Sequence, residues 1–390
     1  MKLGEPKKGD TSWWQILLNV FLVTLVTEEK AETSEDGVTD ANDEHSDPLG
    51  KVRLPRKLPS IVEIKRKLPV SCFDPRVSTS LYYAVKDAVF IATLYVLGEL
   101  MWNYLPLIPF LALTPVFWFA QGTLFTAVFV VGHDCGHGSF SHHPFLNDVV
   151  GTVFHTFLLA PYFTWKVSHK HHHKNTGNID KDEVFYPVRK SDSRGEVALP
   201  WFGLGAGWYG YLIRGYKPRQ VCHINPFQPI FSKHVTACII TLVAMAIWCS
   251  CLYSYAVAFG FWKLFYHYIV PDLVFATYIV IITFLHHTED EIPWYSDHLW
   301  SNVRGQLSSV DRHYGLIHDV IHNIGTHQIH HLFPKIPHYR LEEATRHFRK
   351  EFPDLVKSRD ERILLAFARM FKKYVKQSVI SDDTEVHLYK

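Results

Sequence analysis

The chain has 390 residues, of which 20% are charged and 15% are aromatic, and its formal net charge is +2. Lys and Arg are scattered along the chain, which argues against nucleic-acid binding. Long uncharged runs instead indicate a membrane protein. The six cysteines form no CxxC pair, so we predict neither a disulfide framework nor a thiolate zinc site, and a reducing, cytosol-facing setting fits.

Residues 1–67 are predicted to be a largely disordered N-terminal region. The apolar segment 13–26 is shorter than the about 20 residues that cross a bilayer. We interpret it as an interfacial segment; a signal peptide is the alternative, but no convincing cleavage site follows. Residues 28–50 carry nine acidic side chains and one lysine, which is typical of disorder. The remainder is divided into a main domain, 68–375, and a C-terminal tail, 376–390.

Four apolar runs predict membrane spans in an all-α polytopic protein. They cover residues 88–105, 107–131, 235–259 and 264–285. Pro106 makes the first two a helical hairpin, and Pro271 predicts a kink in the fourth. The run 149–165 is short and contains Pro161, so we interpret it as a re-entrant or interfacial helix. Residues 342–374 have the periodicity of a pair of soluble helices.

Eight histidines form three clusters, in HDCGH, HKHHH and HQIHH. They are His133 and His137; His169, His172 and His173; and His327, His330 and His331. Within each cluster the spacings are i, i+3 and i+4, so the side chains share one helical face. Convergence of several imidazoles is what a metal ion requires of its ligands.

The order of spans and clusters places all three clusters on one side of the membrane. The first two clusters lie between the second and third spans, and the third follows the fourth span. The loops on the opposite side, near Pro106 and at 261–263, contain almost no Lys or Arg, whereas 51–67, 166–190 and the C-terminal region contain many. The positive-inside rule therefore predicts a cytosolic helical cap that holds the histidines.

Further ligands are expected at the end of the fourth span and before the third cluster. His286 and His287 are adjacent in a helix and point about 100° apart, so we expect one of them, His287, to serve. His322 is the other candidate, while His171 points away from the face of its cluster. Carboxylates that could accept imidazole N–H groups are Asp134, Asp180, Asp182, Glu183 and Asp311.

Eight or more imidazoles are too many for one four-coordinate zinc ion and predict a two-metal centre. No serine or cysteine has the setting of a catalytic triad. A two-iron site beside an apolar membrane interior would suit oxygen activation against an apolar substrate.

These motifs resemble the membrane-bound fatty acid desaturases of the methyl-end type. HDCGHGSF, SHKHHHKNTGNIDKDEVFYP and GTHQIHHLFPKIPHY are similar to the three histidine boxes of that family, and the likeness covers residues 69–371. The resemblance implies that the eight clustered histidines bind two iron ions and that His287 supplies the ligand after the last span. Residues 13–26 have no counterpart in it.

The resemblance also implies a reaction and its partners. Dioxygen and two electrons would remove two vicinal hydrogens from a membrane acyl chain and leave a cis double bond. The electrons would come from cytochrome b5 and its NADH-dependent reductase in the endoplasmic reticulum membrane. Front-end relatives carry a fused HPGG haem domain and a Gln at the start of the third box, whereas this chain lacks HPGG and has His327 there.

The flanks of the boxes favour one regioselectivity. HDCGHGSF and HQIHHLFP resemble the ω-3 enzymes more than the HECGH-type Δ12 enzymes. The flank KNTGNIDKDEVFYP also resembles ω-3 enzymes that act on polyunsaturated chains of eighteen and twenty carbons. A Δ12 desaturase, or a related hydroxylase, conjugase or acetylenase, remains the alternative. A membrane metal transporter is a non-enzyme alternative, but it would need ionisable residues in mid-span. The acyl carrier and the oligomeric state do not follow from the sequence.

Overall fold

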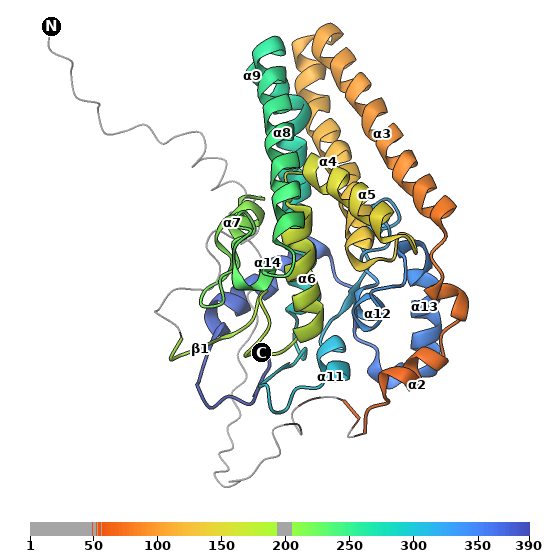
Figure 1. Ribbon diagram of the computed structural model, residues 1–390, viewed down its shortest axis with the longest axis vertical. Helices are drawn as coiled ribbons and strands as arrows, with labels where there is room; N and C mark the ends of the chain where they lie inside the picture. The colour runs from red at the N-terminus through yellow and green to blue at the C-terminus, as the bar shows by residue number, and fades with distance from the viewer. Residues whose placement is uncertain (1–48, 50–51, 53, 56, 193–204) are drawn as a thin grey trace, which may run out of the picture. The chain divides into compact units, whose positions relative to one another are not determined.

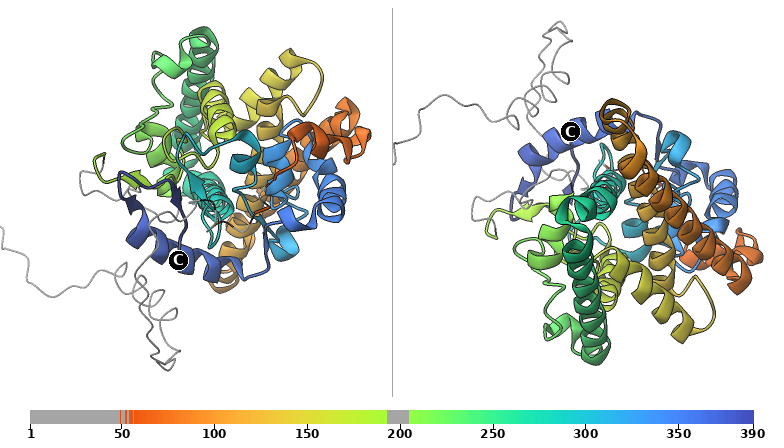
Figure 2. Two further views of the ribbon diagram at one scale, coloured as in Figure 1. Left: turned by 90° about the horizontal axis from the view of Figure 1, so that it is seen from below. Right: turned by 90° about the horizontal axis from the view of Figure 1, so that it is seen from above.

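The computed structural model describes residues 49, 52, 54–55, 57–192 and 205–390. The segment 13–26 and, apart from Leu49, the acidic stretch 28–50 lie outside these residues. The described residues belong to one compact unit. Its long helices are α3 (Val77–Tyr104), α4 (Leu107–His137), α8 (Val235–Phe259) and α10 (Val270–His287) (Figure 1). Viewed end-on, these long helices form one group (Figure 2).

Three of the four predicted spans correspond to helices long and apolar enough to cross a membrane. These are α4, α8 and the continuous helical run Phe261–His287, which comprises α9 (Phe261–Leu264), the π-helical turn η4 (Phe265–Ile269) and α10. The first predicted span, 88–105, is part of α3, which is 28 residues long but does not reach the same apolarity. Lys86, Asp87 and Glu99 interrupt its apolar sequence.

Two prolines lie at helix boundaries, at the positions where the sequence predicted a turn and a kink. Pro106 is the N-cap of α4 and follows directly on the end of α3, so the predicted hairpin is present. Pro271 lies in the first turn of α10, directly after the π-helical turn. A proline has no N–H to donate to the carbonyl four residues earlier, and a π turn is one way for a helix to accommodate that loss.

The first histidine cluster is an extension of the second span rather than a loop after it. α4 continues through His137 and ends at Gly138, whose φ of +69° forms a left-handed cap. The side chains of His133 and His137 therefore project from the last two turns of a long, rigid helix.

The segment predicted as one helix, 149–165, is in fact parts of two. α5 (Pro144–Phe157) begins at a proline, and α6 (Tyr162–Asn175) begins after Pro161. The proline ring sterically disfavours the helical conformation of the residue before it, which explains the break between α5 and α6 at Pro161. On α5, Phe145, Val149 and Val153 are exposed and four residues apart. One apolar face of α5 therefore points away from the protein, as an interfacial helix requires.

Shorter elements surround one end of the long helices (Figure 1). The helices and turns are α2 (Ile61–Arg66), η2 (Val70–Phe73), α7 (Ala206–Arg214), η3 (Pro229–Phe231), α11 (Asn302–Gln306), η5 (Gly315–Ile317), α12 (His327–Leu332), α13 (His338–Glu351), η6 (Pro353–Leu355) and α14 (Ile363–Gln377). The two soluble helices predicted in 342–374 are α13 and α14. α14 buries Ala366, Met370 and Tyr374 in a cluster with Phe284 and Leu285 of α10.

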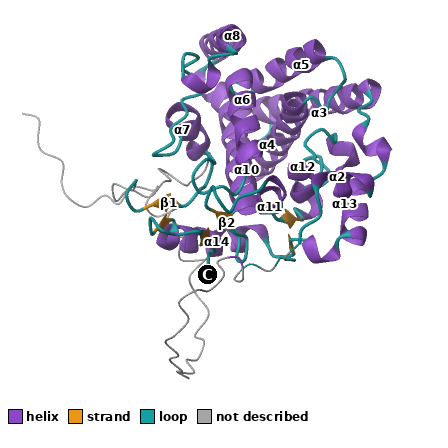
Figure 3. Ribbon diagram, turned by 60° about the horizontal axis from the view of Figure 1, so that its bottom comes forward, coloured by secondary structure: helices purple, strands orange, loops and turns teal. Residues whose placement is uncertain are grey.

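Strands are few and short, and they attach the end of the chain to earlier loops (Figure 3). The pairs are β1 (Val188–Arg189) with β5 (Val379–Ile380), β2 (Trp294–Tyr295) with β6 (Val386–His387), and β3 (Asp311–Arg312) with β4 (Ser358–Arg359). The first and third pairs are parallel and the second is antiparallel. Residues 376–390, predicted as a tail, thus contribute two strands and the buried Tyr389.

Close packing of α5 on α6 generates a stability prediction. A Cβ at Gly151 would overlap the ring of Tyr162, which is fully buried. We expect Gly151→Ala to destabilise the protein by about 1–3 kcal/mol, the usual cost of overpacking. Thermal unfolding in detergent measures the change.

Gly210→Ala on α7 is the matched control, because a Cβ there meets nothing within 4 Å. It should leave the melting temperature unchanged or raise it, since Ala favours a helix over Gly. Equal melting temperatures for the two variants would contradict the packing of α5 on α6.

Candidate metal centre

Nine of the ten histidines predicted as ligands are brought together by four helices. α4 supplies His133 and His137, and α10 supplies His287. α6 and α12 supply the rest, which are His169, His172, His173, His327, His330 and His331. The nine side chains form two adjacent groups.

The first group contains five imidazoles. Its members are His133, His137, His169, His173 and His330, and one ring nitrogen from each lies within 4.8 Å of all the others. The Nε2 atoms of His133 and His137 are 3.3 Å apart, and that of His173 is 3.2 Å from those of His169 and His330. Two nitrogens that bind one ion at about 2.1 Å lie about 3.0–3.4 Å from each other. The spacing therefore fits a common ion.

The second group contains His172, His287 and His331, whose ring nitrogens also lie within 4.8 Å of one another. His327 adjoins it, with its Nε2 3.1 Å from Nε2 of His287 and 3.0 Å from Nε2 of His331. The two groups touch where the rings of His173 and His331 stack, with centroids 4.1 Å apart. The site therefore offers two neighbouring positions for metal ions.

Helical geometry divides the ligands between the two groups. On α6, His169 and His173 are four residues apart and join the first group, while His172 turns to the second. On α12 the assignment is reversed, because His330 joins the first group and His327 and His331 point to the second. Adjacent helical positions point about 100° apart, so one short helix can serve both groups.

Burial keeps these imidazoles neutral. The pKa values of His169, His173, His327, His330 and His331 lie well below the usual value, chiefly because burial disfavours the charged ring and secondly because other histidines are close. Neutral imidazole retains the lone pair that binds a metal.

In the second group, hydrogen bonds to the Nδ1 atoms, on the side of the ring away from the other histidines, orient the imidazoles. The Nδ1–H of His172 donates to Asp182 at 2.7 Å, so its Nε2 lone pair faces the group. Nδ1 of His331 lies 3.2 Å from the Gln306 carbonyl oxygen and 3.2 Å from the Thr176 hydroxyl. Asp182 was among the acceptors predicted from the sequence, whereas no sequence motif marked Gln306 or Thr176.

The other predicted acceptors have different partners. Glu183 pairs with His171, which confirms that His171 is turned away from the groups. Asp134 accepts hydrogen bonds from the backbone N–H and the ring of His338, and its carboxylate also lies 3.9 Å from Nδ1 of His133 in the first group. Asp180 binds Arg189, and Asp311 binds the backbone N–H of Gln328 and the side chain of Arg349.

His322 is not brought into either group. Its Nε2–H donates to Asp87 of α3 at 2.6 Å, and both side chains are buried. His322 and Asn323 have φ values of +57° and +55°, so the chain makes a left-handed turn there instead of extending α12 backwards. Proximity in sequence to His327 was therefore misleading. His286, by contrast, behaves as expected, because its ring bonds to Tyr314 and the carbonyl of Val310 while His287 faces the site.

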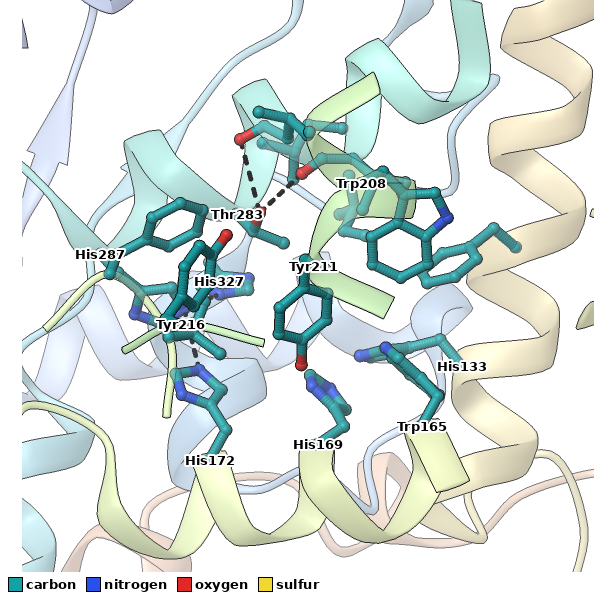
Figure 4. A pocket seen from close by; sticks show the side chains of 18 residues that line it. His133, Trp165, His169, His172, Trp208, Tyr211, Tyr216, Thr283, His287 and His327 are labelled. Carbon is teal, nitrogen blue, oxygen red and sulfur yellow. Dashed lines mark hydrogen bonds between the residues drawn. The ribbon is translucent and has the colours of Figure 1, made fainter. Parts of the chain in front are cut away.

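An apolar cavity of about 70 Å³ adjoins both groups (Figure 4). His133 and His169 of the first group line it, as do His172, His287 and His327. The rest of its wall is mainly aromatic and aliphatic and comes from α4, α6, α7 and α10 and from the loop residues Val184, Phe185, Tyr216 and Ile324. A small apolar group placed there would lie directly against the imidazoles.

Comparison with known proteins decides the family. The sequence model of fatty acid desaturases matches residues 75–362, which include all nine histidines. The chain belongs to the fatty acid desaturase family.

Relatives of this desaturase differ in regioselectivity at similar identity. The sn-1 acyl-lipid omega-3 desaturase (ferredoxin) of Synechocystis is 39% identical, over 85% of this chain and 92% of the relative. The Delta(12)-fatty-acid desaturase of Arabidopsis thaliana is 37% identical, over 75% and 82%. The acyl-lipid omega-3 desaturase (cytochrome b5), endoplasmic reticulum, of the same plant is 36% identical, over 73% and 75%.

The contact between Asp182 and His172 predicts a change in metal affinity. We expect Asp182→Asn to weaken binding at the second group by about 10–100-fold, the usual effect of losing such an acceptor. Titration of the metal-free desaturase with Co²⁺, followed by its visible absorption, measures the affinity.

Asp180→Asn serves as the control, since Asp180 lies in the same loop but bonds to Arg189 and to no imidazole. Equal affinities of the two variants would contradict the orienting role of Asp182.

Proposed function

We propose that this desaturase is a membrane-bound diiron enzyme that inserts a cis double bond at the ω-3 position of polyunsaturated acyl chains. Its substrates would be ω-6 chains of eighteen and twenty carbons. The observation that carries the proposal is the pair of imidazole groups against one apolar cavity.

The residues fit two iron ions. The first ion would be held by His133, His137, His169, His173 and His330, and the second by His172, His287, His327 and His331. Imidazole suits iron as well as zinc, copper and nickel, and iron is favoured here by the histidine boxes. When bound, the iron pair supplies the oxygen chemistry that removes hydrogen from an unactivated carbon.

The protein's own contribution is to place the acyl chain and keep water away from it. Aromatic and aliphatic side chains form most of the cavity wall, so an apolar chain gains from entering it. The hydroxyl groups of Tyr211 and Thr283 are among the few polar atoms that face it besides the histidines (Figure 4). The chain would therefore be held by shape more than by hydrogen bonds.

The proposed location is the endoplasmic reticulum membrane, which one relative carries in its name, with a multi-pass chain whose site faces the cytosol. In α8, the most apolar of the candidate spans, only 11% of the apolar window is buried, as expected of a helix that faces lipid. Glu99 pairs with Lys263 where the α3–α4 hairpin meets α9, which lets both charges lie at the opposite surface. α3 would then be the remaining crossing.

The electron donor proposed is cytochrome b5, reduced by its NADH-dependent reductase. An endoplasmic reticulum relative carries cytochrome b5 in its name, whereas the Synechocystis relative names ferredoxin.

Regioselectivity is tested by the products. Expressed in yeast supplied with linoleate or arachidonate, the desaturase should form a new ω-3 double bond, located by mass spectrometry. His330→Ala should abolish it, because a ligand of the first group is lost. His347→Ala, which changes an exposed histidine on α13, should retain activity.

Other products would contradict the proposal in different ways. Conversion of oleate to linoleate alone would assign a Δ12 enzyme, which the similarity to the Arabidopsis Δ12 relative makes the second candidate. A hydroxylated chain would assign a related oxidation.

Metal content tests the ligand set independently of activity. The purified desaturase should contain two iron ions per chain, and His330→Ala should lose iron from the first group. His322→Ala should keep both ions, because His322 bonds to Asp87 instead. Elemental analysis after gel filtration measures the iron content of the unchanged desaturase and of both variants. Iron lost equally from the two variants would sink the assignment.

A further inference from the structure

We propose that the redox protein that donates electrons docks on one edge of α6, through an acidic face that meets Lys170 and Lys174. At this edge the histidine groups come closest to the solvent. The inference rests on the proposed function and deepens it, because it assigns the surface through which the electrons enter.

Among the described residues, the histidine groups reach the surface at one edge. Seven of the nine clustered histidines are buried, whereas His137 and His169, both of the first group, are partly exposed. The rings of these two lie 5.0 Å apart, so they form a single edge. The apolar cavity is the other approach to the site, and it is the one proposed to hold the acyl chain. An electron carrier that arrives from the solvent therefore meets His137 and His169 first.

Three lysines form a stripe along one side of α6. Lys166, Lys170 and Lys174 recur at intervals of four residues, so they lie one above another on the helix. Lys166 pairs with Asp148. Lys170 and Lys174 are exposed and form no ion pair with the described residues. The stripe therefore presents unneutralised positive charge to the solvent.

The lysine stripe borders the exposed edge of the first group. A Cβ at Gly136 of α4 would lie 3.9 Å from the side chain of Lys166, and His137 is the next residue of that helix. Lys170 directly follows His169, the other half of the edge. Each partly exposed histidine thus has a lysine of the stripe close to it.

The stripe lies on the side of α6 that is turned away from the acyl cavity. Trp165, His169 and His172 project from α6 into the cavity (Figure 4). At about 100° per residue, positions 170 and 174 are rotated by at least about 100° from each of the three. A protein docked on the lysines would therefore leave the acyl chain in place.

A protein that binds to this stripe needs negative charge on the face that carries its redox centre. Lysines without ion-pair partners attract acidic side chains and raise the rate of encounter. A helix is about 10–12 Å across with its side chains, so a carrier docked on α6 is separated from the ligands by no more than about that width. Electron transfer slows steeply with distance, and so short a separation suits it.

Another pair of exposed lysines lies on α14, but its position is less suitable. Lys372 and Lys376 have the same spacing of four residues, whereas α14 contains no histidine. The buried face of α14 packs on Phe284 of α10 through Tyr374. Charge alone would allow docking on α14, and closeness to the ligands favours α6.

The test measures how well the desaturase engages its donor. The double variant Lys170→Glu/Lys174→Glu reverses both charges and changes no histidine. With the soluble haem domain of cytochrome b5 and its NADH-dependent reductase, in neutral detergent at low salt, its KM for cytochrome b5 should rise by about tenfold or more, which is the lower end of what electrostatic steering provides. The maximal rate at saturating cytochrome b5 should be retained. At about 1 M salt, where the Debye length is about 3 Å, the difference in KM should disappear.

Lys372→Glu/Lys376→Glu is the matched control, because it reverses the same number of charges at the same spacing on α14. It should leave the KM for cytochrome b5 unchanged. Reduction by dithionite with methyl viologen needs no docked protein, so product formed with this reductant should be equal in both variants and the unchanged desaturase.

The outcomes separate this inference from the proposed function. If the unchanged desaturase forms no product with either source of electrons, the proposed function fails. Product with dithionite alone refutes cytochrome b5 as the donor and the docking inference with it. An unchanged KM in the α6 variant, or an equal rise in the α14 variant, overturns the docking surface.

Two further results would also overturn the docking surface. Loss of product with dithionite in the α6 variant would show that the lysines are needed by the site itself. A rise in KM that occurs only in vesicles containing phosphatidylserine, and not in neutral detergent, would show that the stripe contacts lipid headgroups instead of the donor.

Discussion

Nine imidazoles lie in two adjacent groups with neighbouring Nε2 atoms only 3.0–3.3 Å apart, and the rest of the structure depends on this constraint. Charged rings at Nε2 separations of 3.0–3.3 Å would repel each other strongly. Burial lowers the pKa values of His169, His173, His327, His330 and His331 and so disfavours that charge, and the long helices keep the rings in place.

The same constraint explains why the metal-binding helices are arranged as they are. α4 and α10 pack against each other along their length, and both end at the site. The position of the histidines at each helix end is therefore fixed by this packing. α12 is only six residues long and depends on neighbours for its position. Gln306 behind His331, the backbone contact of Gln328 with Asp311 and the core around Ile329 supply that support.

Much of the site could be predicted from spacing, and the exceptions have physical causes. The i, i+4 spacings anticipated which histidines the structure brings together. Spacing does not tell which histidine joins which group, because that depends on how α6 and α12 are rotated against each other. His322 was assigned wrongly because a left-handed turn, invisible in the sequence, directs it to Asp87. The fold was predicted less completely around α3, which begins at Val77 and includes the charged Lys86 and Asp87 before the apolar run, and in 149–165, where Pro161 separates two helices.

The account rests on two metal positions with separate histidine ligands, and anomalous diffraction at the iron edge from crystals of the iron-loaded protein tests it most directly. The account predicts two peaks, one among the Nε2 atoms of His133, His137, His169, His173 and His330, and the other among those of His172, His287, His327 and His331. A single peak, or a peak beside His322 and Asp87, would contradict it.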